Sequence, residues 1–175
     1  ICAALFVCWA MLLIKKRHNI SELMQFFMEG AGKLLPIATI LLLALTLGDV
    51  AKSLGTGPYV AGIAGANVPA VFLAPLVFLV SGFIAFSVGS SWGTFAIMIP
   101  IAISIATTLG LSVPMFLGAA LSGGIFGDHA SPISDTTVVA SMAAGTDHIE
   151  HVRTQLPYAM IAGIISIIGF ILLSL

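Results

Sequence analysis

The chain has 175 residues, of which 59% are hydrophobic and only 7% are charged, and its net charge is −1. Soluble domains carry about a quarter charged residues, and a soluble fold of this length could not cover so much apolar surface. The composition therefore predicts an all-α polytopic membrane protein with the lipid bilayer as its solvent. Nothing in the charge indicates a nucleic-acid partner.

The chain begins at Ile1, inside an apolar stretch, with no initiator Met and no signal-peptide layout. We therefore expect residues 1–175 to be a single transmembrane domain that lacks its N-terminal part. The remaining N-terminal half of the same chain is then an expected partner, and a homo-oligomer stays an open alternative.

Two spans separated by a polar segment are predicted first. Residues 1–14 are apolar and end at a basic cluster, residues 15–18, which the positive-inside rule places in the cytoplasm. Residues 15–33 are expected to form a cytoplasmic or interfacial segment, either an amphipathic helix on the inner face or a linker helix packed on its neighbours. Residues 34–52 then form a second span, and residues 59–68 form a connection of small residues.

A long apolar stretch from residue 68 to residue 109 follows, interrupted by hydroxyl-bearing residues at 89–94. Each arm is long enough to span the hydrocarbon core at about 1.5 Å per residue. Two readings stay open here: two full spans joined by a turn, or a re-entrant hairpin whose polar tip lies at membrane depth.

Residues 113–145 are expected to form one crossing, a discontinuous helix that is broken at 127–134. Residues 146–156 then form a cytoplasmic loop, and residues 157–175 the last span, with Pro157 in its first helical turn. The chain is thus predicted to cross the membrane about five times.

The break at 127–134 and its edge carry two aspartates, Asp128 and Asp135, in an otherwise apolar stretch. Pro132 removes a backbone donor and disfavours helix, and the length of helix on either side places the break inside the bilayer. A charged side chain there costs on the order of 2.5 to 3.5 kcal/mol. Two such charges imply a compensating partner: a bound cation, a proton or a water-filled cavity.

Oxygen atoms are concentrated in the same break, and hard cations prefer oxygen ligands. The C-terminal end of the first half-helix adds negative partial charge. We therefore predict an ion- or proton-binding site. Its members are the carboxylates of Asp128 and Asp135 and the hydroxyls of Ser131, Ser134 and Thr136.

Capping of half-helices is the structural alternative for the aspartates. Asp135 is well placed to be the N-cap of a helix from Thr136 onward, but capping would explain one aspartate and not both. His129 is a weaker candidate, because a histidine packed against a carbonyl is at least as expected as a proton partner.

For the other polar residues, a functional role and a purely structural role are about equally expected. Ser90, Ser91 and Thr94 could reach the same site or form a plain interhelical turn. Asp49 lies near the outer end of the second span, close to the membrane interface, where a charged side chain costs little free energy. The segment from His148 to His151 is expected to be a solvated loop or a pH-sensing cluster rather than a metal site, with Asp147 as a helix cap.

Neither ATP-driven transport nor an enzyme is indicated. The nucleotide-binding pattern G-x-x-x-x-G-K-[ST] is absent, and there is no nucleophile triad or metal-ligand cluster with the required spacing. The sequence therefore predicts neither a cofactor nor a catalytic residue.

Four stretches of the chain resemble the NhaC-type Na+/H+ antiporter family. They are Gly127–Thr137, which is the most specific, Gly145–Tyr158, Leu47–Val50 with Leu54–Gly57, and Gly89–Phe95 with Ile99–Ile101. The resemblance covers nearly the whole chain. Because family chains are longer, it implies that this chain is the C-terminal half of such a protein. It implies secondary antiport of sodium against protons across a bacterial inner membrane, and repeats that each contain a re-entrant hairpin and an interrupted helix. On that interpretation residues 90–94 are the hairpin tip.

Competition between Na+ and H+ at Asp128 and Asp135 is the mechanism that we expect. Burial and a like-charged neighbour both favour the protonated carboxyl group, so a proton could expel sodium and sodium could expel the proton. The alternative is an exchanger of a small organic acid or amino acid coupled to Na+ or H+. Such substrates usually need a cation for their carboxylate, and no Lys or Arg falls between Lys52 and Arg153.

Overall fold

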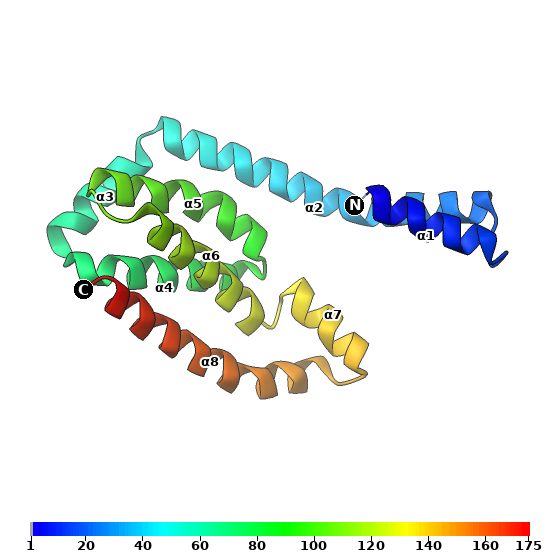
Figure 1. Cartoon of the computed structure of the whole chain (residues 1–175). Helices are drawn as coiled ribbons and strands as arrows, with labels where there is room; N and C mark the ends of the chain where they lie inside the picture. Colours follow the sequence, from blue (N-terminus) through cyan, green and yellow to red (C-terminus); the bar gives the residue numbers. More distant parts are fainter. Residues whose placement is uncertain (1) are drawn as a thin grey trace. The chain divides into compact units, whose positions relative to one another are not determined.

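Every regular element in the described part of the computed structural model is an α-helix, as the composition predicts (Figure 1). The structure describes residues 2–175, except for the side chains at positions 33, 36, 37, 40, 41, 44, 45, 47 and 51; Ile1, where the first predicted span begins, lies outside it. The helices are α1 (Cys2–Ile14), α2 (Ile20–Ser53), α3 (Thr56–Asn67), α4 (Ala70–Val88), α5 (Ser91–Thr108), α6 (Val113–Ala130), α7 (Asp135–Ala144) and α8 (His148–Leu173).

The chain forms two compact units, residues 1–40 and residues 41–175. In the first unit the start of α2 folds back on α1. The rings of Trp9 and Phe27 meet edge to face with centroids 6.3 Å apart, and Leu23 is buried. This packing supports the linker-helix alternative for the segment after the basic cluster. Its location at the membrane surface stays a prediction.

The predicted interfacial helix and second span are joined into the single helix α2. No residue between them breaks the helix. Gly30 and Gly32 keep helical geometry, and no atom lies within 4 Å of the place of a Cβ at either position. Their only unfavourable effect is the low helix propensity of glycine. The separation of these two segments at residues 33 and 34 is therefore wrong as a boundary of secondary structure.

The small-residue connection predicted at 59–68 is helical through residue 67, because residues 59–67 belong to the helix α3. Gly55 has a φ of 70°, a left-handed conformation that glycine adopts without strain, and it reverses the chain after α2. Pro58 lies in the first turn, where a missing N–H is tolerated. The small residues serve packing instead: Gly57 lies directly against Ser104 of α5.

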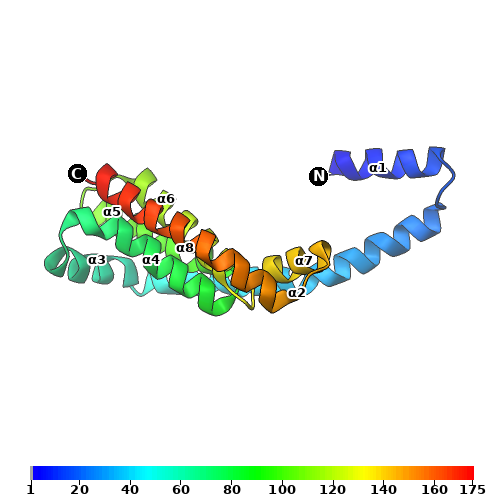
Figure 2. The same ribbon diagram turned by 90° about the horizontal axis from the view of Figure 1, so that it is seen from below.

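The core of the second unit is formed by α4, α5 and α6, with α8 packed on α4 and α6 (Figures 1 and 2). α4 and α6 run in the same direction and approach closely because glycines leave room for the neighbouring backbone. A Cβ on Gly123 would collide with the carbonyl of Phe78, and one on Gly127 with the carbonyl of Gly82. Two helices held this closely end near the same point.

The discontinuous helix is present, but its break is shorter than predicted. α6 continues through Ala130 and α7 begins at Asp135, so the break covers 131–134 and Asp128 lies in the last turn of α6. The helix ends where it does because a residue before proline disfavours helical geometry, and Ser131 precedes Pro132. The glycines before the break do not end the helix.

The loop predicted at 146–156 is replaced by helix from His148 onward. The Asp147 side chain accepts a hydrogen bond of 3.1 Å from the Glu150 backbone N–H, which confirms Asp147 as a cap, and one helix α8 then continues to Leu173. Pro157 therefore lies inside α8 and not in a first turn. A membrane helix accommodates an interior proline where neighbouring groups satisfy the freed carbonyl.

Three helices in the described part of the chain are long and apolar enough to cross a membrane, namely α4, α5 and α8. The turn at residues 89 and 90 separates α4 from α5, which are 19 and 18 residues long. Full spans and a re-entrant hairpin both fit these lengths. The predicted number of about five crossings stays a prediction.

Candidate functional site

Asp128 is the buried carboxylate at the helix break, with only 3% of its surface exposed. The Ser134 hydroxyl donates a hydrogen bond of 2.7 Å to Oδ1, and the Thr136 hydroxyl donates a longer one of 3.4 Å to Oδ2. The hydroxyl oxygens of Ser134 and Thr136 lie 2.7 Å apart. Three predicted site residues, Asp128, Ser134 and Thr136, therefore come together.

Ser131 connects the break to the end of α4. Its hydroxyl donates a hydrogen bond of 2.7 Å to the carbonyl of Phe86 and accepts one of 3.3 Å from the Ile133 backbone N–H. Gly89, which ends α4 with a φ of 71°, lies so close to Ile133 that an added Cβ would be 2.8 Å from the Ile133 carbonyl oxygen. The turn between α4 and α5 therefore touches the break.

The hydroxyl residues of that turn lie beside the site without bonding to Asp128. Thr94 is fully buried and donates to the carbonyl of Ser90 at 3.1 Å. Its methyl group lies against Gly124, one helical turn before Asp128. Ser90 and Ser91 flank the start of α5 and are half-buried. Within the described residues, the turn lies close to the site but none of its side chains forms a hydrogen bond with the Asp128 carboxylate.

Asp135 is the first residue of α7, one position after the N-cap residue Ser134, so the prediction of Asp135 as N-cap is off by one. Its side chain is exposed and accepts a hydrogen bond of 2.8 Å from the Thr136 backbone N–H. No hydrogen bond joins the carboxylates of Asp128 and Asp135 in the described part of the chain. The two aspartates therefore occupy different environments, one buried and one open.

His129 points away from Asp128. It is exposed, and its Nδ1 lies 2.9 Å from the carbonyl oxygen of Ile125, one turn earlier in α6. The backbone carbonyl of His129 in turn accepts a hydrogen bond of 2.9 Å from the Gln155 side chain on α8. This arrangement matches the expectation of a histidine packed against a carbonyl.

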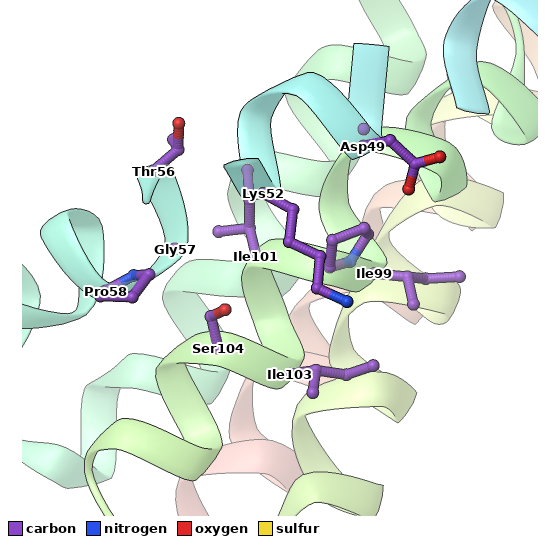
Figure 3. A pocket seen from close by; sticks show the side chains of 11 residues that line it. Asp49, Lys52, Thr56, Gly57, Pro58, Ile99, Ile101, Ile103 and Ser104 are labelled. Atoms are coloured by element: carbon purple, nitrogen blue, oxygen red, sulfur yellow. The ribbon is translucent and has the colours of Figure 1, made fainter. Parts of the chain in front are cut away.

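Asp49 lines a separate pocket of about 400 Å³ in the second unit, between the end of α2, the start of α3 and the middle of α5 (Figure 3). Lys52 extends into the same pocket, and Ser104 of α5 lines its wall (Figure 3). The pocket holds charges of both signs, but Asp49 shares no contact with the residues of the break. The structure therefore separates Asp49 from the other predicted site residues.

Four helix ends surround the break. α4 and α6 end there, joined by the bond from Ser131 to Phe86, and α5 and α7 begin there. The C-terminal ends of α4 and α6 carry negative partial charge and the N-terminal ends of α5 and α7 carry positive partial charge, so helix ends of both signs meet at the break. The sequence left open whether the turn at 89–94 reaches the site, and the contact between Gly89 and Ile133 brings the turn to the break.

The two histidines near the start of α8, His148 and His151, have different surroundings. In the part of the chain that the structure describes, no group of three His, Cys, Asp or Glu side chains is placed to hold a metal ion. His148 instead turns toward the break, where its Nε2 lies 2.6 Å from the carbonyl oxygen of Pro132. The sequence placed this residue in a loop, so the contact was not predicted.

Comparison with known proteins adds a family match over residues 1–175, to a model described as the Na+/H+ antiporter family. A malate-2H(+)/Na(+)-lactate antiporter of Bacillus subtilis is 34% identical over 95% of this chain and 37% of its own length. An arginine/ornithine antiporter, ArcD, of Halobacterium salinarum is 41% identical over 61% of this chain and 22% of its own.

The Na(+)/H(+) antiporter NhaC of Alkalihalophilus pseudofirmus is 34% identical over 49% of this chain and 18% of its own length. The chain thus spans between about a fifth and somewhat over a third of these relatives. No solved structure matches it.

Proposed function

The chain belongs to the Na+/H+ antiporter family, and from this premise we propose that it forms part of a secondary antiporter that exchanges Na+ for H+ at Asp128. The protein would lie in a bacterial inner membrane as a multi-pass protein, with the rest of its own chain as partner. The transported Na+ and H+ are then its substrates, and the exchange requires no cofactor.

The buried carboxylate of Asp128, with two hydroxyls turned toward it, is the observation that supports this proposal. α6 contains 15 residues before Asp128 (113–127), or about 22 Å of helix at 1.5 Å per residue. If α6 begins at one membrane surface, Asp128 lies within the hydrocarbon core of about 30 Å. A lone charge at that depth is costly, so a bound cation or a proton stabilises this site.

Sodium would replace the hydroxyl hydrogens as the partner of the carboxylate. The oxygens of Ser134 and Thr136 lie beside Asp128, and each hydroxyl keeps lone pairs that can face a cation when its hydrogen turns away. Proton binding to Asp128 removes the negative charge and thereby releases Na+.

Asp135 has a supporting role in this proposal. Its exposed carboxylate lies at the open edge of the break, where it raises the local concentration of cations without being the buried ligand. The exposed side of the site would alternate by rocking of one half of the complete transporter against the other.

Replacement of Asp128 by Asn tests the proposal in proteoliposomes that contain the full-length protein. Asn keeps the shape and loses the charge, so D128N should abolish proton movement driven by a Na+ gradient. D135N should retain exchange with a higher half-saturating Na+ concentration. The matched control is E29Q, the same loss of a carboxylate charge at an exposed position on α2. Full exchange by D128N would refute the assignment of Asp128.

Exchange of a small organic acid or amino acid is the second candidate function. It is favoured by the pocket in which Asp49 and Lys52 present opposite charges, as a zwitterion or a carboxylate requires. Two relatives are named as antiporters of malate with lactate and of arginine with ornithine. We propose substrates of the same chemical class for this chain.

Lys52→Gln separates the two candidate functions. Under Na+/H+ exchange at Asp128, K52Q should keep the Na+-driven proton movement of the parent protein. Under substrate exchange, labelled malate or arginine should be taken up against an internal pool, and K52Q should lower that uptake at least about tenfold by loss of a charged hydrogen bond. Absence of uptake for both labelled compounds would count against the second function.

A further inference from the structure

The side chain of His148 joins three elements around the break. It is the first residue of α8 and is partly buried. Its Nε2 lies 2.6 Å from the carbonyl oxygen of Pro132, within the break. Its Nδ1 lies 3.2 Å from the hydroxyl of Ser141, on α7, which is itself buried. One imidazole ring thus connects α8, α7 and the break.

Hydrogen-bond chemistry fixes the direction of the shorter contact. A carbonyl oxygen can only accept, so Nε2 carries a hydrogen and donates it to Pro132. The opposite nitrogen faces a hydroxyl, which can act as donor or acceptor. The ring is therefore oriented from both sides, as is usual for a histidine that has a structural task close to a binding site.

The carbonyl of Pro132 depends on this contact. In the described residues the break is closed by two backbone hydrogen bonds. The Ser131 N–H donates to the backbone carbonyl of Asp128 at 3.1 Å, and the Ser134 N–H donates to the backbone carbonyl of Ser131 at 3.4 Å. Neither bond satisfies the Pro132 carbonyl. Non-helical backbone at membrane depth persists only where its polar groups find partners, and His148 supplies this one.

The chain between α7 and α8 is built to return His148 to the break. Gly145 ends α7 with a φ of 64°, a left-handed conformation suited to glycine. Asp147 then caps α8 through the Glu150 N–H. The start of α8 is thereby fixed in place, and the first side chain of the helix faces the break.

From these contacts we infer that His148 is a positioning residue for the ion site, and that it acts through the Pro132 carbonyl. Pro132 lies between Ser131, which anchors the break to α4, and Ser134, which holds the Asp128 carboxylate at 2.7 Å. When His148 holds the Pro132 carbonyl, the Ser134 hydroxyl stays within hydrogen-bond distance of the Asp128 carboxylate. The effect on sodium binding rests on the proposed function, whereas the effect on the backbone of the break does not.

Three substitutions in the full-length protein test this role. His148→Ala removes both contacts, and His148→Gln keeps an amide N–H donor near the position of Nε2. His151→Ala is the matched control, because His151 lies one turn further along α8 and its buried Nε2 contacts no hydrogen-bond partner in the described residues. If H148A does not purify, His148→Asn replaces it, because its shorter amide can reach Ser141 but not Pro132.

Two measurements are made on each variant. Hydrogen–deuterium exchange reports the amides of Ile133 and Ser134 independently of transport, and H148A should exchange them about tenfold faster, as expected for loss of one hydrogen bond. The half-saturating Na+ concentration in proteoliposomes should rise at least about tenfold, with the maximal rate little changed. H148Q and H151A should stay within about twofold of the parent in both.

The outcomes separate the inference from the proposed function. Unchanged amide exchange in H148A, or an H148Q protein that behaves like H148A, would overturn the role of His148. A parent protein without sodium-dependent proton movement would refute the proposed function, while the amide exchange would still decide whether His148 holds the break.

Discussion

Ser134 and Thr136 both turn a hydroxyl toward Asp128, but their hydrogen bonds differ in length and in exposure to solvent. Ser134 is fully buried and donates at 2.7 Å, whereas Thr136 is exposed and donates at 3.4 Å. A hydrogen bond to a charged group contributes about 1.5–3 kcal/mol when short and buried, and less when long and open to water. Ser134 should therefore be the more important neighbour.

Ser134→Ala is expected to raise the half-saturating Na+ concentration about tenfold or more, because about 1.4 kcal/mol corresponds to a factor of ten. Thr136→Val, which keeps the shape of threonine, should raise it only about twofold. Both are measured as the Na+ dependence of proton movement in proteoliposomes. A larger effect for T136V than for S134A would contradict the geometry of the site.

At the scale of residues, the sequence indicated which polar side chains gather at the break better than it indicated their orientation. It indicated Asp128, Ser131, Ser134 and Thr136, because polar groups in an apolar stretch need partners. It could not show that Asp135 faces outward. Successive residues in a helix differ in direction by about 100°, so an uncertainty of one residue in the start of α7 decides whether a carboxylate is buried or exposed.

At the scale of elements, the position of the break depends on how closely α4 and α6 approach. Gly127 lies directly against the backbone of Gly82, so an added methyl group would push two helices apart. Gly118 is on the same helix with nothing within 4 Å of an added Cβ. These two glycines therefore distinguish packing from helix propensity.

Gly127→Ala should destabilise the protein by about 1–3 kcal/mol, as overpacking does, and should lower its midpoint of thermal unfolding in detergent. Gly118→Ala should be neutral or slightly stabilising, because alanine favours helix over glycine by about 1 kcal/mol. Equal midpoints for the two variants would show that α4 and α6 do not pack as described.

Element boundaries were the weakest part of the sequence prediction. The two polar interruptions at 89–94 and 127–134 correspond to real helix ends, because glycine at positive φ and a residue before proline leave a local signal. The helix at 56–67 was missed, and the segment that begins α8 was placed in a loop although Asp147 was identified as a helix cap. Small residues and scattered charges resemble a loop, and in these segments tertiary packing and a side-chain cap stabilise the helix.

At the scale of the whole molecule, the site joins elements that are distant along the chain. The end of α4, the break and the start of α8 meet through Phe86, Ser131, Pro132 and His148. No charged residue lies between Lys52 and Asp128 in the sequence, so the buried carboxylate is conspicuous in an apolar domain. The chain spans a third or slightly more of the relatives that it matches over most of its length, and the complete transporter is expected to require the rest.

Competition between Na+ and H+ at Asp128 is the central claim, and it predicts that sodium displaces protons from the protein itself. Binding of either ion weakens the other equally, so the apparent affinity for Na+ should fall as the pH is lowered. The most direct test is addition of Na+ to purified full-length protein in weakly buffered solution, with a pH indicator. We predict proton release from the parent protein and none from D128N. Equal release from both proteins, or release from neither, would contradict the claim.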